Sequence, residues 1–200
     1  MFYSFSRRVV QACLAVFFRF ETYGTEHEPS SGPLLVCCNH RSLWDPPIVG
    51  SFLQRKMHFM AKAELFNIPV LGSIFRSYGA LPVTRGGLSM ETMKTAIRTL
   101  KQGNALVIFP EGTRQRSNKL GSGKKGAASL ALRSGAKILP VAVIGPYRLF
   151  RPMKFVCGEA FDAADFANLP SSEQLDALTV KIMSSIHSLI EQHGGYGDMK

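Results

Sequence analysis

The sequence predicts an α/β fold: a single domain with a largely parallel or mixed central sheet flanked by helices, preceded by an N-terminal amphipathic helical segment suited to membrane contact. Short apolar runs alternate with stretches of helical periodicity, as in sheets whose strands are joined by helices. The 200-residue chain is long enough for one sizeable core and short for two. We therefore assign residues 1–28 to the N-terminal helix and its connection, and residues 29–200 to the α/β domain.

The first 20 residues form the predicted amphipathic helix. Its apolar side chains recur at helical spacing, at Phe2, Phe5, Val9, Ala12, Cys13, Val16 and Phe20. The unbroken apolar stretch at residues 12–18 is far shorter than the roughly 20 residues that span a bilayer. Arg7 and Arg8 precede it, as in a signal peptide, but no small-residue cleavage site follows. Two interpretations stay open: the helix lies on an anionic membrane surface, or it packs on its own domain.

Strands and helices alternate through the rest of the chain. Five consecutive apolar residues at 34–38 are typical of a strand covered on both faces in a parallel sheet. After this strand we expect, in order, a helix at about 46–54, a strand at 57–60, a helical segment beginning at Pro69, a strand at 81–83, a helix at 89–100, a strand at 105–109, a helix at 126–133, strands at 138–144 and 155–157, and a final helix from Ser171.

Composition restricts the partners. Lys and Arg outnumber Asp and Glu by 24 to 14, and the net charge of +10 attracts nucleic acid, anionic lipid or phosphorylated substrates. Aromatic and cationic residues are not interleaved as a base-stacking surface requires, so we expect no nucleic acid. The spacing of Cys13, Cys37, Cys38 and Cys157 favours a reducing, cytoplasmic setting. Since adjacent strand residues point to opposite faces, Cys37 and Cys38 cannot easily ligate one ion with His40, and we expect no metal.

A histidine and an acid follow the strand at 34–38. His40 lies at its carboxyl end, where ligands bind in open α/β sheets. Asp45 would lie on a different face of a regular helix, so the two side chains meet only if a turn folds between them. Asp45 before Pro46 favours a helix start with Asp45 as the N-cap. Two interpretations stay open from this segment alone: Asp45 caps the helix beside a loop histidine, or it orients His40 as a general base that activates a substrate hydroxyl.

Two loops are candidate phosphate-binding sites. The strand at 105–109 runs into Pro-Glu-Gly-Thr-Arg at 110–114, a glycine-containing loop followed by further cations. It is not a P-loop, because the later Gly123-Lys124 is followed by a lysine instead of Ser or Thr. The second candidate is the stretch at 79–86, which presents Arg85 at a strand end, and a planar guanidinium suits bidentate phosphate binding.

Four ordered blocks resemble those of the 1-acyl-sn-glycerol-3-phosphate acyltransferase family. They are Asn39-His40 with Asp45, Gly-Ala-Leu-Pro-Val-Thr-Arg at 79–85, Phe-Pro-Glu-Gly-Thr-Arg at 109–114 and Ile-Leu-Pro-Val at 138–141. The first and third blocks together are highly specific, whereas the second and fourth alone would be weak. Gln115 stands where a serine is common, and Gly123 precedes two lysines where an aromatic residue is common. Neither difference removes a catalytic residue.

The resemblance implies transfer of a fatty acyl group from acyl-CoA or acyl carrier protein to the sn-2 hydroxyl of lysophosphatidic acid, giving phosphatidic acid without a cofactor. It implies that His40 takes the hydroxyl proton and that Asp45 orients His40. The residues implied to hold the glycerol phosphate are Arg85, Glu111, Gly112, Thr113 and Arg114, with phosphate assigned to the two arginines and hydroxyl binding or loop organisation to Glu111. The implied location is peripheral, on the cytoplasmic face of the cell membrane.

Two alternative functions stay open. A related acyltransferase that uses another lysophospholipid or glycerol-3-phosphate as acceptor would carry the same blocks. A non-catalytic lipid- or phosphate-binding protein could use the same basic loops.

Overall fold

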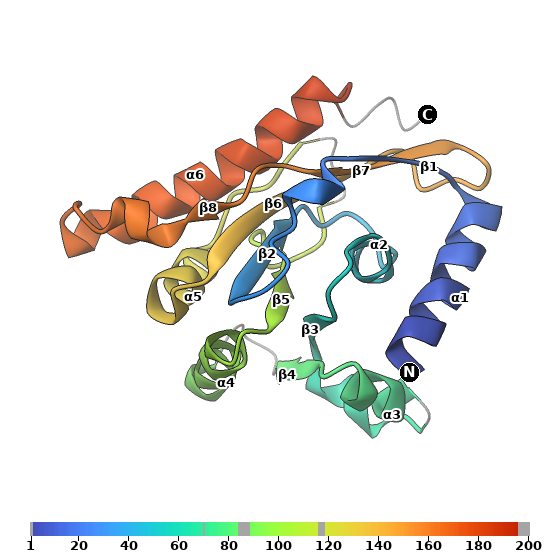
Figure 1. Ribbon diagram of the computed structural model, residues 1–200, viewed down its shortest axis with the longest axis horizontal. Helices are drawn as coiled ribbons and strands as arrows, with labels where there is room; N and C mark the ends of the chain where they lie inside the picture. The colour runs from blue at the N-terminus through green and yellow to red at the C-terminus, as the bar shows by residue number, and fades with distance from the viewer. Residues whose placement is uncertain (1, 70, 84–88, 116–118, 196–200) are drawn as a thin grey trace.

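The computed structural model describes residues 2–69, 71–83, 89–115 and 119–195 (Figure 1). Its helices are α1 (Phe2–Phe17), α2 (Asp45–Phe52), α3 (Leu71–Ser77), α4 (Met90–Lys101), α5 (Gly126–Ser134) and α6 (Ser171–Gln192), with 3₁₀ turns η1 (Thr25–His27), η2 (Ala63–Asn67) and η3 (Ala163–Phe166). Its strands are β1 (Arg19–Tyr23), β2 (Leu34–Cys38), β3 (Met57–Lys62), β4 (Leu81–Val83), β5 (Ala105–Ile108), β6 (Lys137–Ile144), β7 (Pro152–Cys157) and β8 (Phe161–Asp162). The elements predicted from the sequence are present within a few residues of their expected bounds.

A mixed sheet joins the strands in the order β1-β7-β6-β2-β5-β3-β4, and β8 pairs with β6. Neighbouring strands from β6 to β4 are parallel, while β7 and β8 run antiparallel to β6. β1 lies parallel to β7 at one edge. The short connection between β6 and β7 permits an antiparallel pair, whereas parallel neighbours need longer crossovers. The predicted α/β class with a largely parallel or mixed sheet is confirmed.

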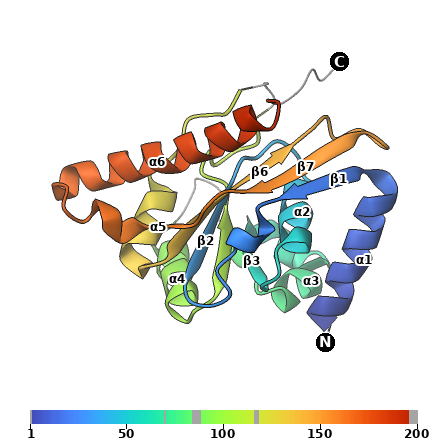
Figure 2. The same ribbon diagram turned by 45° about the horizontal axis from the view of Figure 1, so that its top comes forward.

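β2 lies in the middle of the sheet, and its side chains are buried on both faces. All five residues of Leu34–Cys38 have 0% exposed surface. Leu35 and Cys37 pack in the core shared with α4, α5 and α6, whereas Val36 and Cys38 pack in the core beneath α1 and α2. Figure 2 shows these two layers, with α6 on one side of the sheet and α1 and α2 on the other. The thiols of Cys37 and Cys38 therefore face opposite layers, as expected for adjacent strand residues.

α1 packs on α2 through a face that combines apolar and polar side chains. Leu14 and Phe18 are buried in the core beneath the two helices. Arg7 and Gln11, about two turns and one turn before Leu14, donate hydrogen bonds of 2.6–3.1 Å to main-chain oxygens at and just beyond the carboxyl end of α2. These carbonyls have no partner within their own helix, so the two polar side chains satisfy them and allow this face to be covered.

The apolar stripe predicted for the N-terminal helix faces outward. Phe5, Val9 and Val16 are 68%, 45% and 65% exposed. A helix is present where the sequence predicted one, but the face that meets the domain is not the predicted apolar stripe. Within the described residues, no helix has both the length and the apolar character needed to cross a membrane.

Residues 19–23 form the edge strand β1, where the end of the first helix and a connection were expected. α1 ends at Phe17, and β1 pairs with β7 from Arg19 opposite Pro152 to Tyr23 opposite Val156. The aromatic and β-branched residues of β1 favour a strand. A single five-residue edge strand gives only a weak periodic signal, and its partner lies far along the chain, so the pairing could not be read locally.

Candidate active site

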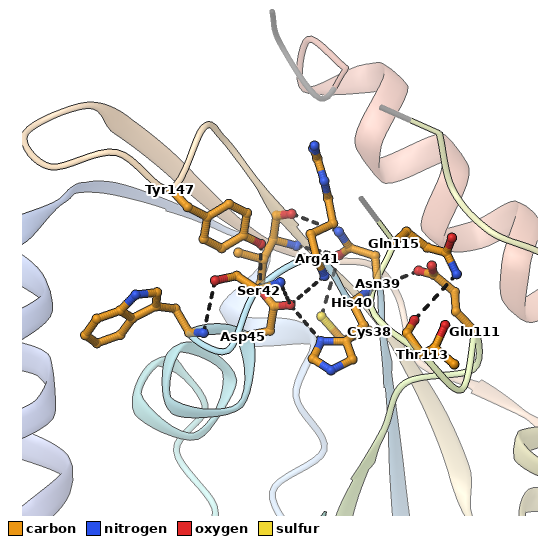
Figure 3. Close-up of polar contacts among 12 residues, drawn as sticks. Cys38, Asn39, His40, Arg41, Ser42, Asp45, Glu111, Thr113, Gln115 and Tyr147 are labelled. Carbon is orange, nitrogen blue, oxygen red and sulfur yellow. Dashed lines mark hydrogen bonds and ion pairs between the residues drawn. The ribbon is translucent and has the colours of Figure 1, made fainter. Parts of the chain in front are cut away.

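His40 and Asp45 form a hydrogen-bonded pair at the carboxyl end of β2 (Figure 3). His40 Nδ1 lies 2.9 Å from Asp45 Oδ2. The Asp45 side chain is fully buried, whereas the His40 side chain keeps 18% of its surface exposed. Because the carboxylate accepts the proton on Nδ1, the tautomer assigned from this contact leaves the lone pair of Nε2 available as a base. The contact required by the general-base interpretation is therefore present.

The same carboxylate stabilises the turn between the two residues. Asp45 Oδ2 also accepts hydrogen bonds from the main-chain N–H groups of Arg41, at 2.7 Å, and Ser42, at 2.8 Å. The expectation that Asp45 is the N-cap of the next helix was wrong, because Asp45 is the first residue of α2 and caps no N–H of that helix. Pro46 and Pro47 have no N–H to offer, so the carboxylate bonds backward to the turn.

The loop after β5 holds the main chain of His40. Glu111 Oε1 accepts a hydrogen bond from the His40 N–H at 3.1 Å, and the Gln115 N–H donates to the His40 carbonyl at 2.8 Å. The His40 ring also stacks on Phe109, with ring centroids 4.0 Å apart and planes 20° apart. β2 and β5 are parallel neighbours, so their carboxyl ends lie at the same edge of the sheet. The two most specific blocks of the sequence thus build one site.

Asn39 ties the start of this turn to β6. Its side-chain Nδ2 donates to the Val143 carbonyl at 2.9 Å, and its Oδ1 accepts from the Val143 N–H at 2.8 Å. The side chain is fully buried. These two hydrogen bonds extend the pairing between β2 and β6 by one residue beyond Cys38, the last β2 residue in register with β6. Asn39 therefore fixes the chain on the residue before His40, a role that the sequence analysis did not assign.

Tyr147 is a member of the site that sequence reasoning missed. It lies in the loop that joins β6 to β7, and its hydroxyl donates a hydrogen bond of 2.5 Å to Asp45 Oδ1 across 102 positions of sequence. No local pattern around Tyr147 signals this contact. It exists because β6 and β2 are paired, which brings the two carboxyl ends together.

Glu111 is buried, with 3% of its surface exposed. Burial raises the pKa of Glu111, and the N–H groups of His40 and Gly121 act in the opposite direction. Of the two roles assigned to Glu111 from the resemblance, the contact with His40 matches loop organisation. A direct contact with the substrate stays a prediction.

We expect Glu111→Gln to give a melting temperature at pH 7 equal to or above that of the wild type. Folding raises the pKa of the Glu111 carboxyl. Below the pKa that this carboxyl has in the unfolded chain, it is neutral in both the folded and the unfolded protein and does not affect the free energy of unfolding. It then weakens the fold progressively as the pH rises through the folded pKa. Burial outweighs the opposing N–H groups, so the charged carboxylate has a net cost that the neutral amide avoids, and the amide oxygen can still accept the His40 N–H. Thermal melts at pH 4 and pH 7 should show the variant gaining on the wild type as the pH rises.

The matched control for this prediction is Glu159→Gln, which removes an exposed carboxylate. Its melting temperature should follow that of the wild type at both pH values. A Glu111→Gln protein that loses stability relative to the wild type as the pH rises would contradict the assignment.

A cavity of about 640 Å³ lies beside His40. α1, α2, β3, η2 and α3 contribute to its walls, and Leu43, Phe59 and Phe75 are among its apolar side chains. Within the described part of the chain, no carboxylate lines it. Its cations are Arg7, Lys62 and Arg114. The cavity thus combines apolar walls with positive charge next to the histidine.

The predicted glycerol-phosphate residues are partly described. Arg85 lies outside the described residues. Gly112 has φ of 72°, in the left-handed region that favours glycine, and a Cβ there would lie 2.9 Å from Lys124 atoms. Thr113 and Arg114 are exposed on the same loop, and Arg114 lines the cavity together with His40. The structure therefore places Arg114 and His40 on the same cavity, while phosphate binding stays a prediction.

The cysteine and serine beside His40 are not arranged as nucleophiles. The Cys38 thiol is fully buried, and burial raises its pKa well above the usual range. Ser42 Oγ accepts a hydrogen bond from the Trp44 N–H at 3.2 Å. The fold and the site are those of an α/β enzyme in which a histidine is oriented by a buried carboxylate, an arrangement that suits a base for a bound substrate.

Known proteins identify the family of this enzyme. A family model described as Acyltransferase matches residues 19–144. A 1-acyl-sn-glycerol-3-phosphate acyltransferase of Bacillus subtilis is 33% identical over 193 residues, covering 94% of this chain and 96% of that protein. One from Streptococcus pneumoniae is 31% identical over 153 residues, covering 74% of this chain and 56% of that protein. The chain belongs to the acyltransferase family.

The fold agrees with this family. A crystal structure of the 1-acyl-sn-glycerophosphate (LPA) acyltransferase PlsC from Thermotoga maritima is similar, with a TM-score of 0.79. At 24% identity, the likeness covers 98% of this chain and 81% of that chain. It extends over the α/β architecture as a whole.

Proposed function

We propose that the protein transfers a fatty acyl group from acyl-CoA or acyl carrier protein to the sn-2 hydroxyl of 1-acyl-sn-glycerol-3-phosphate, forming phosphatidic acid. The observation that carries this proposal is the His40–Asp45 pair beside an apolar cavity that also holds Arg114. A full-length relative named for this activity supports the choice of acceptor.

In the proposed mechanism, His40 Nε2 accepts the proton of the sn-2 hydroxyl while the hydroxyl oxygen attacks the thioester carbonyl carbon. The tetrahedral intermediate collapses with loss of the thiolate, which takes the proton from Nε2. Asp45 keeps the imidazole in position and stabilises the imidazolium formed between the two steps. An ester bond forms as the thioester bond breaks, so the reaction needs no cofactor, metal ion or acyl-enzyme.

The cavity suits an amphiphilic substrate. Its apolar walls at Leu43, Phe59 and Phe75 suit an acyl chain. The Arg114 guanidinium can bind phosphate in a bidentate manner, and Arg85 is proposed as a second phosphate ligand from the family resemblance. The sn-2 hydroxyl is on the carbon next to the phosphate-bearing one, so a phosphate held at Arg114 brings that hydroxyl toward His40.

A donor-by-acceptor activity matrix on the purified protein tests the proposal. Acyl-CoA and acyl carrier protein thioesters are combined with lysophosphatidic acid, other lysophospholipids and glycerol-3-phosphate, and released thiol is measured. The highest kcat/KM is expected with lysophosphatidic acid. A higher value with another acceptor would identify a related acyltransferase, and lysophosphatidic acid binding without thiol release would identify a non-catalytic lipid-binding protein.

We further propose a peripheral location on the cytoplasmic face of the cell membrane, with the outward face of α1 on an anionic lipid surface. Phe5 and Val16 of that face are largely exposed. Leu149 and Phe150, in the β6–β7 loop, are 59% and 64% exposed. This loop adjoins the end of α1, because the Phe150 N–H donates to the Phe17 carbonyl at 2.7 Å. The net charge of +10 favours anionic head groups, and the acyl chains of the substrates reside in lipid.

The double variant Phe5→Ser/Val16→Ser is expected to bind anionic liposomes about tenfold or more weakly than the wild type. Full burial of each apolar side chain in lipid stabilises binding by about 1.5–3 kcal/mol, and serine loses this contribution. Cosedimentation with vesicles is the measurement. Both positions are exposed, so the melting temperature should stay unchanged. Deletion of α1 is a poorer test, because it would also remove Leu14 from the core.

Met90→Ser/Val180→Ser is the matched control. These side chains are each 67% exposed, on α4 and α6, the helices that cover the other face of the sheet. The control should cosediment like the wild type. Equal cosedimentation of the α1 double variant and the wild type would rule out this face of α1 as the membrane contact.

A further inference from the structure

Tyr147 adopts a backbone conformation that its residue type disfavours. Its φ is 51°, in the left-handed region where a non-glycine residue is uncommon. The Tyr147 N–H donates to Met153 Sδ at 3.4 Å, and the Phe150 N–H donates to the Phe17 carbonyl at 2.7 Å, so both halves of the loop are held. Disfavoured backbone persists where surrounding contacts impose it, and it clusters at functional sites.

The Tyr147 hydroxyl engages the carboxylate oxygen of Asp45 that does not bind His40. Oδ1 accepts from Tyr147 Oη at 2.5 Å, while Oδ2 accepts from His40 Nδ1 and from two main-chain N–H groups of the turn. With donors on both oxygens, the plane of the carboxylate is fixed. Burial raises the pKa of Tyr147 well above its usual value, and the charge of Asp45 acts in the same direction, so the phenol stays protonated and able to donate at neutral pH.

We propose that Tyr147 is a positioning residue for acyl transfer, whose hydroxyl fixes the Asp45 carboxylate so that Oδ2 faces Nδ1 of His40. This proposal rests on the proposed function. In Figure 3, Tyr147 and His40 lie on opposite sides of Asp45, consistent with one residue acting on the other through the carboxylate. The Tyr147 ring also packs against the core beneath α1 and α2. Phenylalanine keeps that packing and removes only the hydroxyl.

Tyr147→Phe is expected to lower kcat about tenfold, with KM for lysophosphatidic acid and for the acyl donor within about twofold of the wild type. A residue that only supported the loop would change stability without this split between kcat and KM. The matched control is Tyr23→Phe, which removes a hydroxyl that donates to an exposed carboxylate, Glu21 Oε2, at 2.7 Å. The control should leave both parameters unchanged.

A double-mutant cycle with Asp45→Asn tests whether Tyr147 acts through Asp45. In the Asp45→Asn background, Tyr147→Phe should cost less than about twofold in kcat, because the carboxylate that it positions is absent. An unchanged kcat of Tyr147→Phe in the wild-type background would overturn the proposal. So would an equal loss in both backgrounds, or an effect on KM alone.

A spectroscopic measurement keeps the test valid if Tyr147→Phe does not fold. In protein labelled with 3-fluorotyrosine, the ¹⁹F resonance of Tyr147, assigned by phenylalanine substitution of the other tyrosines, should shift in Asp45→Asn. An unmoved resonance would overturn the contact without reference to activity. A wild type that acylates no acceptor would instead refute the proposed function, so the two failures are distinguishable.

Discussion

Replacing His40 with alanine is expected to lower kcat for acyl transfer by about a thousandfold or more, while the fold and lysophosphatidic acid binding are retained. His40 lines the cavity, and in the proposed mechanism its Nε2 accepts the hydroxyl proton, which alanine has no group to do. Loss of the ring removes its stack on Phe109, which costs about 0.5–1.5 kcal/mol, a small part of the stability of a typical domain. Thiol release measures turnover, and titration calorimetry measures binding.

His187→Ala is the matched control for this experiment. His187 lies on α6 with 61% of its side-chain surface exposed, and its contact with Glu191 is at 4.0 Å. Turnover of the control should equal that of the wild type, and circular dichroism should show the same fold for all three proteins. If His40→Ala still turned over at a rate near the wild type, the base would have to be another residue.

The strand that delivers His40 could be predicted because its signal is local. Five apolar residues at 34–38 indicated a buried strand, and the structure has a strand with these bounds and full burial. The meeting of His40 and Asp45 was conditional on a turn, which is present. The prediction that Asp45 caps the helix was wrong, because its carboxylate accepts hydrogen bonds from the main-chain N–H groups of Arg41 and Ser42, which precede it.

The residues that support the pair from other strands could not be predicted in the same way. Tyr147 reaches Asp45, and Val143 reaches Asn39, only after β6 has paired with β2 in one register. These contacts join residues more than 100 positions apart. Neither Gly-Pro-Tyr at 145–147 nor Val143 lies in a sequence motif that predicts its contact. The family blocks supplied the candidate catalytic residues His40 and Asp45, whereas the residues that hold this pair in place depend on tertiary pairing.

The first helix shows a different limit of sequence reasoning. Periodicity predicted a helix, but it could not decide which face meets the domain. Arg7 and Gln11 could donate their hydrogen bonds either to water or, as the structure has it, to main-chain oxygens near the end of α2. On this face, Leu14 and Phe18 supply the apolar contact with the core. The outward stripe is the reason that the membrane proposal is tested at Phe5 and Val16.

Asp45→Asn is expected to lower kcat by about 100-fold to 10,000-fold with little change in KM. Four donors point at the carboxylate: His40 Nδ1, the N–H groups of Arg41 and Ser42, and the Tyr147 hydroxyl. An amide has one acceptor oxygen in place of two and carries no charge. If its oxygen replaces Oδ2, the turn persists but the imidazolium loses its counter-charge.

The opposite amide orientation is worse for both stability and catalysis. An NH₂ group at the Oδ2 position would oppose the N–H groups of the turn, at a cost of about 1–3 kcal/mol for each buried donor left unpaired. It would also favour the His40 tautomer that carries its proton on Nε2, which cannot accept the proton of the substrate. We therefore expect a modest loss of melting temperature with a large loss of kcat.

Asp176→Asn is the matched control, because Asp176 is 59% exposed and pairs with Lys125 on the surface at 2.6 Å. Exposed ion pairs contribute little, so its kcat and melting temperature should stay near those of the wild type. Steady-state kinetics and thermal melts on both variants separate the two effects. An Asp45→Asn protein that keeps kcat within about fivefold of the wild type would show that His40 needs neither the charge nor the orientation provided by Asp45. The contact at 2.9 Å would then serve the turn alone.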